Sequence, residues 1–91
     1  MTTDRELLEL AARAAGIHPH DIECTWNPLT DDGDALRLAV KLGLDVFCRP
    51  SQWSECGRIG NAGFREKHGT DPYAATRRAI VRAAAAIGEQ A

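Results

Sequence analysis

The stretch WNPLTDDGDALRLAVKLGLDV, residues 26–46, carries the clearest structural signals of the chain. Thr30 or Asp31 can cap a helix, and the aspartates that follow lie where the helix dipole is positive. Apolar residues then recur at helical spacing as far as Gly43, which can adopt the left-handed conformation that ends a helix. The pattern predicts a helix with a wide apolar face, made of Ala35, Leu36, Leu38, Ala39, Val40 and Leu42.

A strand is expected directly after this helix. From residue 44 to residue 49, apolar residues alternate with a second set in the period of two that is typical of a strand with one buried face. We expect the apolar side of this strand to be buried against the central helix. That side consists of Leu44, Val46 and Cys48.

An earlier helix is predicted over residues 4–15. Thr3 is followed three residues later by Glu6, which is the spacing of a capping box, and Gly16 can end the helix. The apolar face of this helix consists of Leu7, Leu10, Ala11 and Ala14.

The segment between these two helices is predicted to be mostly irregular. A residue that precedes a proline is pushed out of the helical region, so residues 18–20 form a loop around Pro19. Residues 22–27 are expected to form a short extended segment, in which Cys24 serves as a small apolar residue.

After the central strand, residues 50–55 are rich in turn-forming residues and predict a connection. A hairpin is expected next, with strands over residues 56–59 and 62–67. Gly60 and Asn61 would form its tight turn, because both accept the positive backbone angles that such a turn requires.

The segment DPYAATRRAIVRAAAAIG, residues 71–88, predicts the last helix. Asp71 can cap it, Pro72 occupies the first helical position, where its missing amide costs nothing, and Gly88 provides the stop. Alanines in the last turns would let this helix approach a sheet closely. Its inward face consists of Tyr73, Thr76, Ile80, Ala83, Ala84 and Ile87.

Three helices and about three short strands predict an α+β fold in a single domain, residues 1–91. The sheet is expected to be mainly antiparallel. A single-layer sheet must bury both of its faces unless one is polar, so we expect helices on opposite sides of it, as in a small α/β/α sandwich.

The composition is that of a small globular protein, with 44% apolar and 26% charged residues among 91. No apolar run approaches the roughly 18 residues that cross a bilayer, and no secretory signal is evident, so we expect a cytosolic protein without a membrane partner. The three cysteines are odd in number and irregularly spaced, which favours reduced thiols.

Three segments of the chain resemble a known family, the phage α/β/α sandwich domain of small phage and prophage proteins. These segments are TDRELLELAARAAGI (3–17), WNPLTDDGDALRLAVKLGL (26–44) and DPYAATRRAIVRAAAAIG (71–88). The resemblance implies a three-layer sandwich and a phage or prophage origin, and hence the cytosol of a bacterial host. It implies no activity, cofactor or catalytic residue.

No motif for catalysis, for metal binding or for a cofactor stands out in the sequence. Structural zinc ligands come in close pairs, whereas Cys24, Cys48 and Cys56 lie far apart. A Gly-x-Ser-x-Gly elbow and a P-loop are both missing, and a pairing of Cys56 with His68 in space is left open. We therefore expect no metal, no cofactor and no catalytic residue, and a small enzyme is only the second alternative.

Charge is distributed unevenly, because residues 1–48 carry a net charge of −5 and residues 49–91 carry +3. The first alternative function is therefore nucleic-acid binding through a basic face. That face would consist of Arg65, Lys67, Arg77, Arg78 and Arg82. A calculated pI of about 5.8 is low for a nucleic-acid binder and weakens this alternative.

The function that the sequence favours is that of a non-catalytic protein-binding adaptor or regulator. This function requires an exposed apolar or aromatic patch, which we expect at Trp53, and binding that depends only weakly on salt. The partner would be a host or phage protein, and the chain itself is expected to be a monomer.

Overall fold

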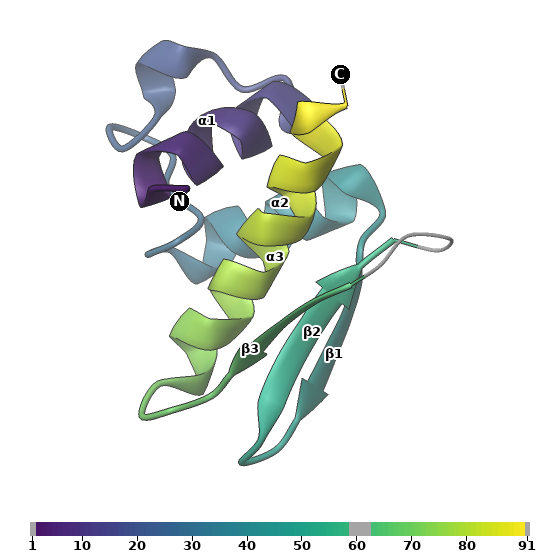
Figure 1. Ribbon diagram of the computed structural model, residues 1–91. Coiled ribbons are helices and arrows are strands. Elements are labelled where there is room, and N and C mark those ends of the chain that lie inside the picture. Colours follow the sequence, from purple (N-terminus) through teal and green to yellow (C-terminus); the bar gives the residue numbers. More distant parts are fainter. Residues whose placement is uncertain (1, 59–62, 91) are drawn as a thin grey trace.

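The computed structural model describes residues 2–58 and 63–90, in which three α-helices accompany a three-stranded antiparallel sheet (Figure 1). The helices are α1 (Asp4–Ala15), α2 (Asp32–Leu42) and α3 (Pro72–Glu89), and a short 3-10 helix, η1, spans Pro19–Asp21. The strands are β1 (Asp45–Arg49), β2 (Trp53–Gly57) and β3 (Phe64–Lys67), in the spatial order β1-β2-β3. The predicted α+β class, with three helices and three short antiparallel strands, is confirmed.

Local capping signals set the ends of α1 and α2 as predicted. The backbone N–H of Glu6 donates to Thr3 Oγ1 at 3.1 Å, and the N–H of Thr3 donates back to the Glu6 carboxylate at 3.4 Å. Asp31 caps α2 by accepting a hydrogen bond of 2.8 Å from a backbone N–H in its first turn. Gly16 and Gly43 end the two helices with φ angles of 73° and 64°, in the left-handed region that favours glycine.

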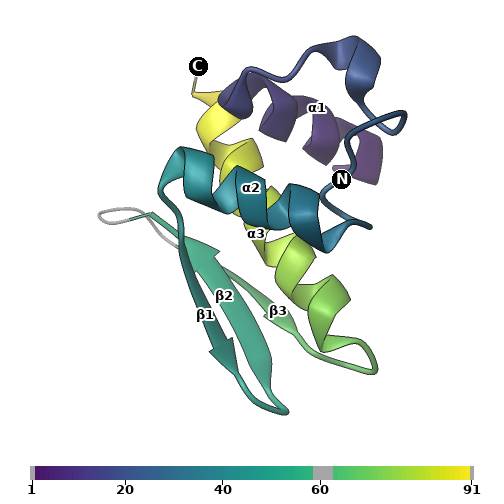
Figure 2. The same cartoon turned by 180° about the vertical axis from the view of Figure 1, so that it is seen from behind.

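Helix α3 is the central element of the fold. It packs on β2 and β3 on one side and on α1 and α2 on its other sides, so that the sheet and α1 lie on opposite sides of it (Figures 1 and 2). Its buried residues surround the helix and are mostly small: Ala75, Ala79, Ile80, Val81, Ala83, Ala84, Ala85 and Gly88. Asp71 caps α3 as predicted, by accepting hydrogen bonds of 3.1 Å from the N–H groups of Tyr73 and Ala74.

The helices lie on one side of the sheet, whereas the sequence predicts helices on both sides. α3 covers the side of the sheet that carries Ser54, Cys56 and Phe64, while α1 and α2 pack on α3. The small residues around α3 explain the difference, because they let two further helices pack on it in addition to the sheet. Among the residues that the structure describes, no helix covers the opposite side of the sheet (Figure 1).

The second strand begins earlier than predicted. Arg49 pairs with Trp53, so the connection between β1 and β2 contains residues 50–52 rather than residues 50–55. Ser51 completes this short turn with a φ angle of 63°, and the N–H of Gln52 donates to the carbonyl oxygen of Arg49 at 3.0 Å. Trp53 is therefore part of the sheet and not of a loop.

The predicted hairpin after this turn is confirmed as the antiparallel pair of β2 and β3, with Cys56 opposite Phe64. β2 ends at Gly57, two residues before the predicted end of that strand. The predicted turn at Gly60 and Asn61 lies outside the described residues.

The edge strand β1 is exposed along its whole length, so the prediction that Val46 and Cys48 are buried is wrong, whereas Leu44, just before the strand, is half-buried against the core. Val46 and Cys48 do lie on the side of the sheet that faces α3, since they pair with the buried residues Cys56 and Ser54. They remain exposed because α2 packs against α3 rather than over β1.

The buried face of α2 is narrower than predicted for the same reason. Leu36 and Val40, expected on the buried face, are 64% and 73% exposed. Because α2 packs mainly on α3 and only lightly on α1, it buries a narrow stripe made of Ala35, Leu38 and Ala39, with Leu42 half-buried beside it.

Helix α1 turns a somewhat different face inward. Leu8 and Ala12 are buried with Ile22 in a small second cluster, because the segment after α1 folds back over the helix. Leu10 and Ala14 are only half-buried as a result. The residues of α1 that are buried are Leu7, Leu8, Ala11, Ala12 and Ala15.

Two further details between the helices differ from expectation. Residues 22–27 form turns with a single bridge between Ile22 and Trp26, instead of an extended segment, and Cys24 is exposed. Tyr73, expected on the buried face of α3, is exposed because a groove separates the first turn of α3 from α2.

Gly88 is a packing residue inside α3 rather than its stop, since the helix continues to Glu89. A Cβ atom built on Gly88 would lie 1.9 Å from the carbonyl oxygen of Leu10 and 2.7 Å from its carbonyl carbon. Both atoms belong to the backbone of α1 and cannot move aside. The missing side chain therefore lets α1 and α3 cross in direct contact.

Gly88→Ala is expected to lower the free energy of unfolding by about 1–3 kcal/mol, the usual cost of overpacking, although alanine has the higher helix propensity. Gly33→Ala in α2 is the matched control, because a Cβ atom there would meet only the side-chain ends of Arg37 and Asp31. Urea denaturation of both variants measures the difference. Equal stability of the two variants would contradict the close crossing of α1 and α3.

Candidate functional site

The six residues that the sequence singles out for partner binding occupy three separate places. Trp53, Arg65 and Lys67 lie on the side of the sheet that faces away from α3, which we call the open face. Arg78 and Arg82 lie on α3 beside β3, and Arg77 lies on α3 next to the start of α2. The structure therefore does not join them into one continuous basic surface.

Arg77 connects α3 to the segment that begins α2. Its Nη1 atom lies 2.6 Å from Asp32 Oδ1, and its Nε–H donates to the carbonyl oxygen of Leu29 at 2.8 Å. The Arg77 side chain is only 16% exposed. Its contacts hold two elements of the fold together and leave little of the guanidinium for a ligand.

The other two arginines of α3 are also paired with carboxylates. Arg78 Nη1 lies 2.8 Å from Asp4 Oδ1, and Arg82 forms an ion pair with Glu66 of β3. The Arg82 guanidinium also lies 5.0 Å from the centroid of the Phe64 ring. Exposed pairs of this kind contribute little to stability, but they offset the positive charge that would attract phosphate.

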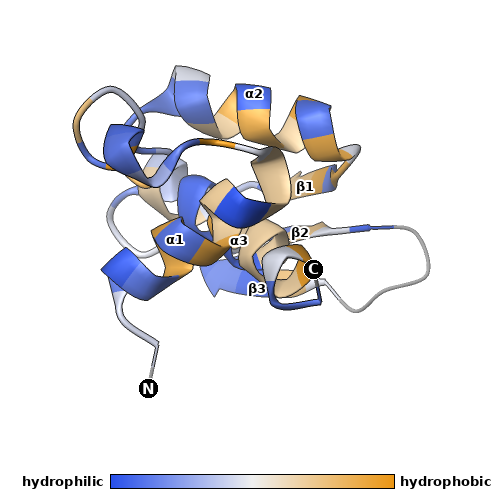
Figure 3. Ribbon diagram, turned by 90° about the horizontal axis from the view of Figure 1, so that it is seen from above, coloured by the Kyte–Doolittle hydropathy of each residue, from blue (hydrophilic) through white to orange (hydrophobic). Residues whose placement is uncertain are grey.

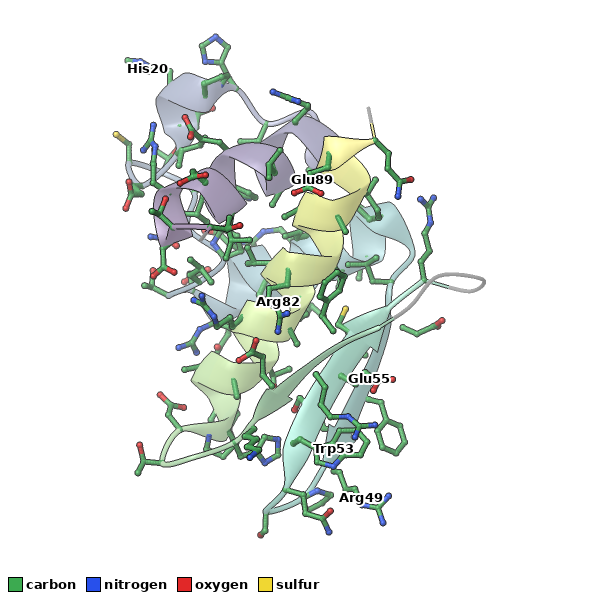
Figure 4. The ribbon with its side chains drawn as sticks, viewed as in Figure 1. His20, Arg49, Trp53, Glu55, Arg82 and Glu89 are labelled. Atoms are coloured by element: carbon green, nitrogen blue, oxygen red, sulfur yellow. The ribbon has the colours of Figure 1, made fainter. Side chains whose placement is uncertain are left out.

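The open face presents the side chains that alternate with the buried ones along the three strands. Its residues are Asp45, Phe47 and Arg49 of β1, Trp53 and Glu55 of β2, and Arg65 and Lys67 of β3. Figure 4 shows Arg49, Trp53 and Glu55 pointing away from the helices. Three basic and two acidic side chains give this face a mixed charge.

An aromatic pair with two arginines occupies the open face. The ring centroids of Phe47 and Trp53 are 5.8 Å apart, with a tilt of 36° between the rings. The Arg65 guanidinium carbon lies 3.7 Å from the centroid of the Trp53 ring, and that of Arg49 lies 5.9 Å from it. Arg65 is held there by Glu55, whose Oε1 atom accepts a hydrogen bond of 3.2 Å from Arg65 Nε.

Sequence reasoning found Trp53 and Arg65 but missed their neighbours Phe47 and Arg49. The available signal was the alternation in β1, which places Phe47 between Asp45 and Arg49 on the outward side of the strand. A large aromatic residue among charged residues on that side indicates an exposed contact rather than a core position.

A series of hydrogen bonds runs from the buried Ser54 to the first turn of α3 on the other side of the sheet. Ser54 Oγ is 2.8 Å from His68 Nε2 and 2.7 Å from Thr76 Oγ1, and the Thr76 hydroxyl donates to the carbonyl oxygen of Pro72 at 2.8 Å. Since the Thr76 proton is used on Pro72, Ser54 donates to Thr76 and accepts from His68.

This direction of hydrogen bonding indicates that Ser54, His68 and Thr76 have a structural role. A nucleophilic serine donates to its histidine, whereas Ser54 accepts from His68 and is fully buried. No sequence motif could show the contact, because Ser54 and Thr76 are 22 positions apart. The pairing of Cys56 with His68, left open by the sequence, is replaced by the bond from His68 to Ser54.

The three cysteines occupy different environments. Cys56 is fully buried, and burial, with a smaller contribution from the charge of Asp45, raises the pKa of its thiol to about 12. Cys24 and Cys48 are exposed, which corrects the prediction that both serve as buried apolar residues. Within residues 2–58 and 63–90, no three His, Cys, Asp or Glu residues lie close enough together to hold a metal ion.

Thiol alkylation under native conditions is therefore expected to modify Cys24 and Cys48 and to spare Cys56, because only an accessible thiolate reacts. Mass spectrometry of the intact and digested protein after treatment with iodoacetamide at mildly alkaline pH measures the outcome. Unfolding in denaturant should make Cys56 reactive as well. Rapid labelling of Cys56 in the folded protein would contradict its position beneath α3.

Comparisons with protein-family models, with curated proteins and with solved structures find no match to this chain. No helix in the described part of the chain is both long enough and apolar enough to cross a membrane. The resemblance to phage proteins remains a prediction from the sequence, and the geometry of the surfaces supplies the functional argument.

Proposed function

We propose that the chain is a non-catalytic adaptor or regulator that binds another protein through the open face. The partner surface would offer an apolar recess for Phe47 and Trp53, with acidic side chains opposite Arg49, Arg65 and Lys67. The observation that carries the proposal is the aromatic pair of the exposed Phe47 and the half-buried Trp53, held by arginines on a sheet face that no helix among the described residues covers.

The composition of the open face supports a protein partner. Tryptophan and arginine dominate the residues that contribute most to binding at protein interfaces. Phe47 is 55% exposed, so a partner would bury a large apolar area. The contacts of Trp53 with Phe47 and Arg65 order these side chains before binding, which lowers the entropy lost in the complex.

The contacts of Trp53 and of the arginines of α3 argue against the alternative function, nucleic-acid binding. A base would have to stack on the Trp53 ring, but the Arg65 guanidinium already lies against one side of that ring. Arg77, Arg78 and Arg82 are paired with carboxylates and do not extend the open face. The sheet alone offers too few free positive charges for strong phosphate binding.

The setting of this function is part of the proposal. The resemblance of three segments to phage and prophage proteins supports an accessory protein of phage origin that acts in the cytosol of a bacterial host. The partner would then be a host or phage protein.

Affinity capture from a lysate of lysogenic host cells tests this function when it is performed with matched variants. Wild type is compared with Phe47→Ala and Trp53→Ala on the open face, and with Tyr73→Ala, an exposed aromatic residue elsewhere. We expect a protein that wild type and Tyr73→Ala retain equally and that both open-face variants bind roughly tenfold or more weakly. Binding of the purified partner should change little as salt is raised.

Gel shifts with a short DNA duplex and a single strand test the rival at the same time. A shift at low salt that is lost with Arg65→Ala would replace protein binding by nucleic-acid binding. A captured protein that the open-face variants retain as well as wild type does would also overturn the proposal.

A further inference from the structure

The edge strand β1 carries an unusual set of exposed residues. In the described part of the chain it pairs only with β2, so its other edge presents free backbone N–H and C=O groups. Its sequence is DVFCR, and all five residues are exposed. Val46 is 41% and Phe47 is 55% exposed. An edge strand with an apolar centre is a template for pairing with a further strand.

The sequence of β1 is complementary to itself when read in the opposite direction. If two copies pair antiparallel with Phe47 opposite Phe47, Asp45 of each copy lies opposite Arg49 of the other. Val46 of each copy lies opposite Cys48 of the other. Since Val46 and Cys48 are two positions apart, their side chains lie on the same face of the sheet. Every side chain then meets a suitable neighbour.

The charges at the two ends of β1 lack such neighbours within one chain. Neither Asp45 nor Arg49 has an ion-pair partner among the described residues. Antiparallel pairing of two copies gives each of these charges a partner of opposite sign. Because the dimer is symmetric, the pair of Asp45 with Arg49 forms twice.

Apolar surface of the helical layer ends at the same edge. A groove of about 490 Å³ lies between α2, β1 and the first turns of α3, and Leu36, Val46 and Tyr73 are among its exposed apolar lining residues. Val40 lies one helical turn from Leu36 and is also exposed. Figures 2 and 3 show α2 and β1 on the same side of α3, so both layers stop at this edge.

We propose that two copies of the chain form a symmetric dimer through β1, with a continuous six-stranded sheet. The helices of both copies then lie on the same side of that sheet, and the exposed apolar residues of α2 and β1 face those of the second copy across the axis. This assembly departs from the monomer that the sequence leads us to expect. An unrelated strand could pair with the β1 edge, but the matching of Asp45 with Arg49 favours a second copy of this chain.

Charge reversal tests this dimer sharply, because the same two positions meet across the axis. Asp45→Arg places two arginines opposite each other at both ends of the paired strands, and Arg49→Asp places two aspartates there. Each single variant is expected to dimerise about tenfold or more weakly than wild type. The double variant, Asp45→Arg with Arg49→Asp, restores opposite charges and should dimerise like wild type. Sedimentation velocity over a wide concentration range measures all four proteins.

A mixture of the two single variants gives the most specific outcome. One variant then carries two arginines and the other two aspartates, so both cross-strand pairs are opposite in charge. The mixture is expected to form a heterodimer although neither variant dimerises well alone. Circular dichroism and thermal unfolding confirm that each variant is folded.

Two results would overturn the dimer. Wild type that sediments with a mass of 9.9 kDa at every concentration would exclude it, and so would single variants that dimerise as well as wild type does. Trp53→Ala separates this inference from the proposed function, because Trp53 is on β2 and lies outside the β1 edge. That variant is expected to remain dimeric while it loses the captured protein.

Discussion

The close packing of other elements around α3 is the constraint on which the rest of the structure depends. Alanines and Gly88 make up most of its buried residues, so the backbones of α1 and α2 and the sheet can all approach this one helix. At Gly88 the approach is so close that a single methyl group would meet the backbone of Leu10. A chain with only five aromatic residues builds its core in this way, from many small contacts instead of a few large side chains.

This arrangement decides which surfaces stay exposed. Because α1 and α2 bury their apolar stripes against α3, neither is left to cover the second face or the β1 edge of the sheet. Phe47 remains exposed and Trp53 half-buried on the open face, and Leu36, Val40 and Val46 remain exposed at the edge. The arginines of α3 meanwhile pair with carboxylates of α1, β3 and the start of α2, and so they act within the fold. The surfaces offered to partners are therefore aromatic and apolar more than basic.

The sequence predicts those parts of the structure that depend on neighbouring residues. The caps at Thr3, Asp31 and Asp71 and the stops at Gly16 and Gly43 involve groups only a few positions apart, and all of them are confirmed. Periodicity also identifies the helices and strands. It cannot say which element will cover an apolar face, because that depends on contacts between distant segments. The prediction for β1 fails for this reason, since its period of two is correct but its expected cover packs on α3 instead.

The same limit applies to the candidate site. Trp53 and Arg65 are recognisable as candidates, but their contact across two strands depends on the register of the sheet. The structure does not group Arg77, Arg78 and Arg82 with them, because these arginines pair with carboxylates elsewhere in the fold. For Gly88, the sequence predicts a common local role, the end of a helix. The structure shows instead that this glycine is required for a contact with α1, which is distant in the sequence.

Solvent exposure of individual side chains, measured by NMR with a soluble paramagnetic probe, tests most directly that the three helices lie on one side of the sheet. The probe should strongly broaden the ring signals of the exposed Phe47, broaden those of the half-buried Trp53 less strongly, and leave the methyl signals of Leu38, Ile80 and Val81 sharp. Protected rings at Phe47 and Trp53, with contacts to residues of α1 or α2, would place a helix over the open face and contradict this arrangement.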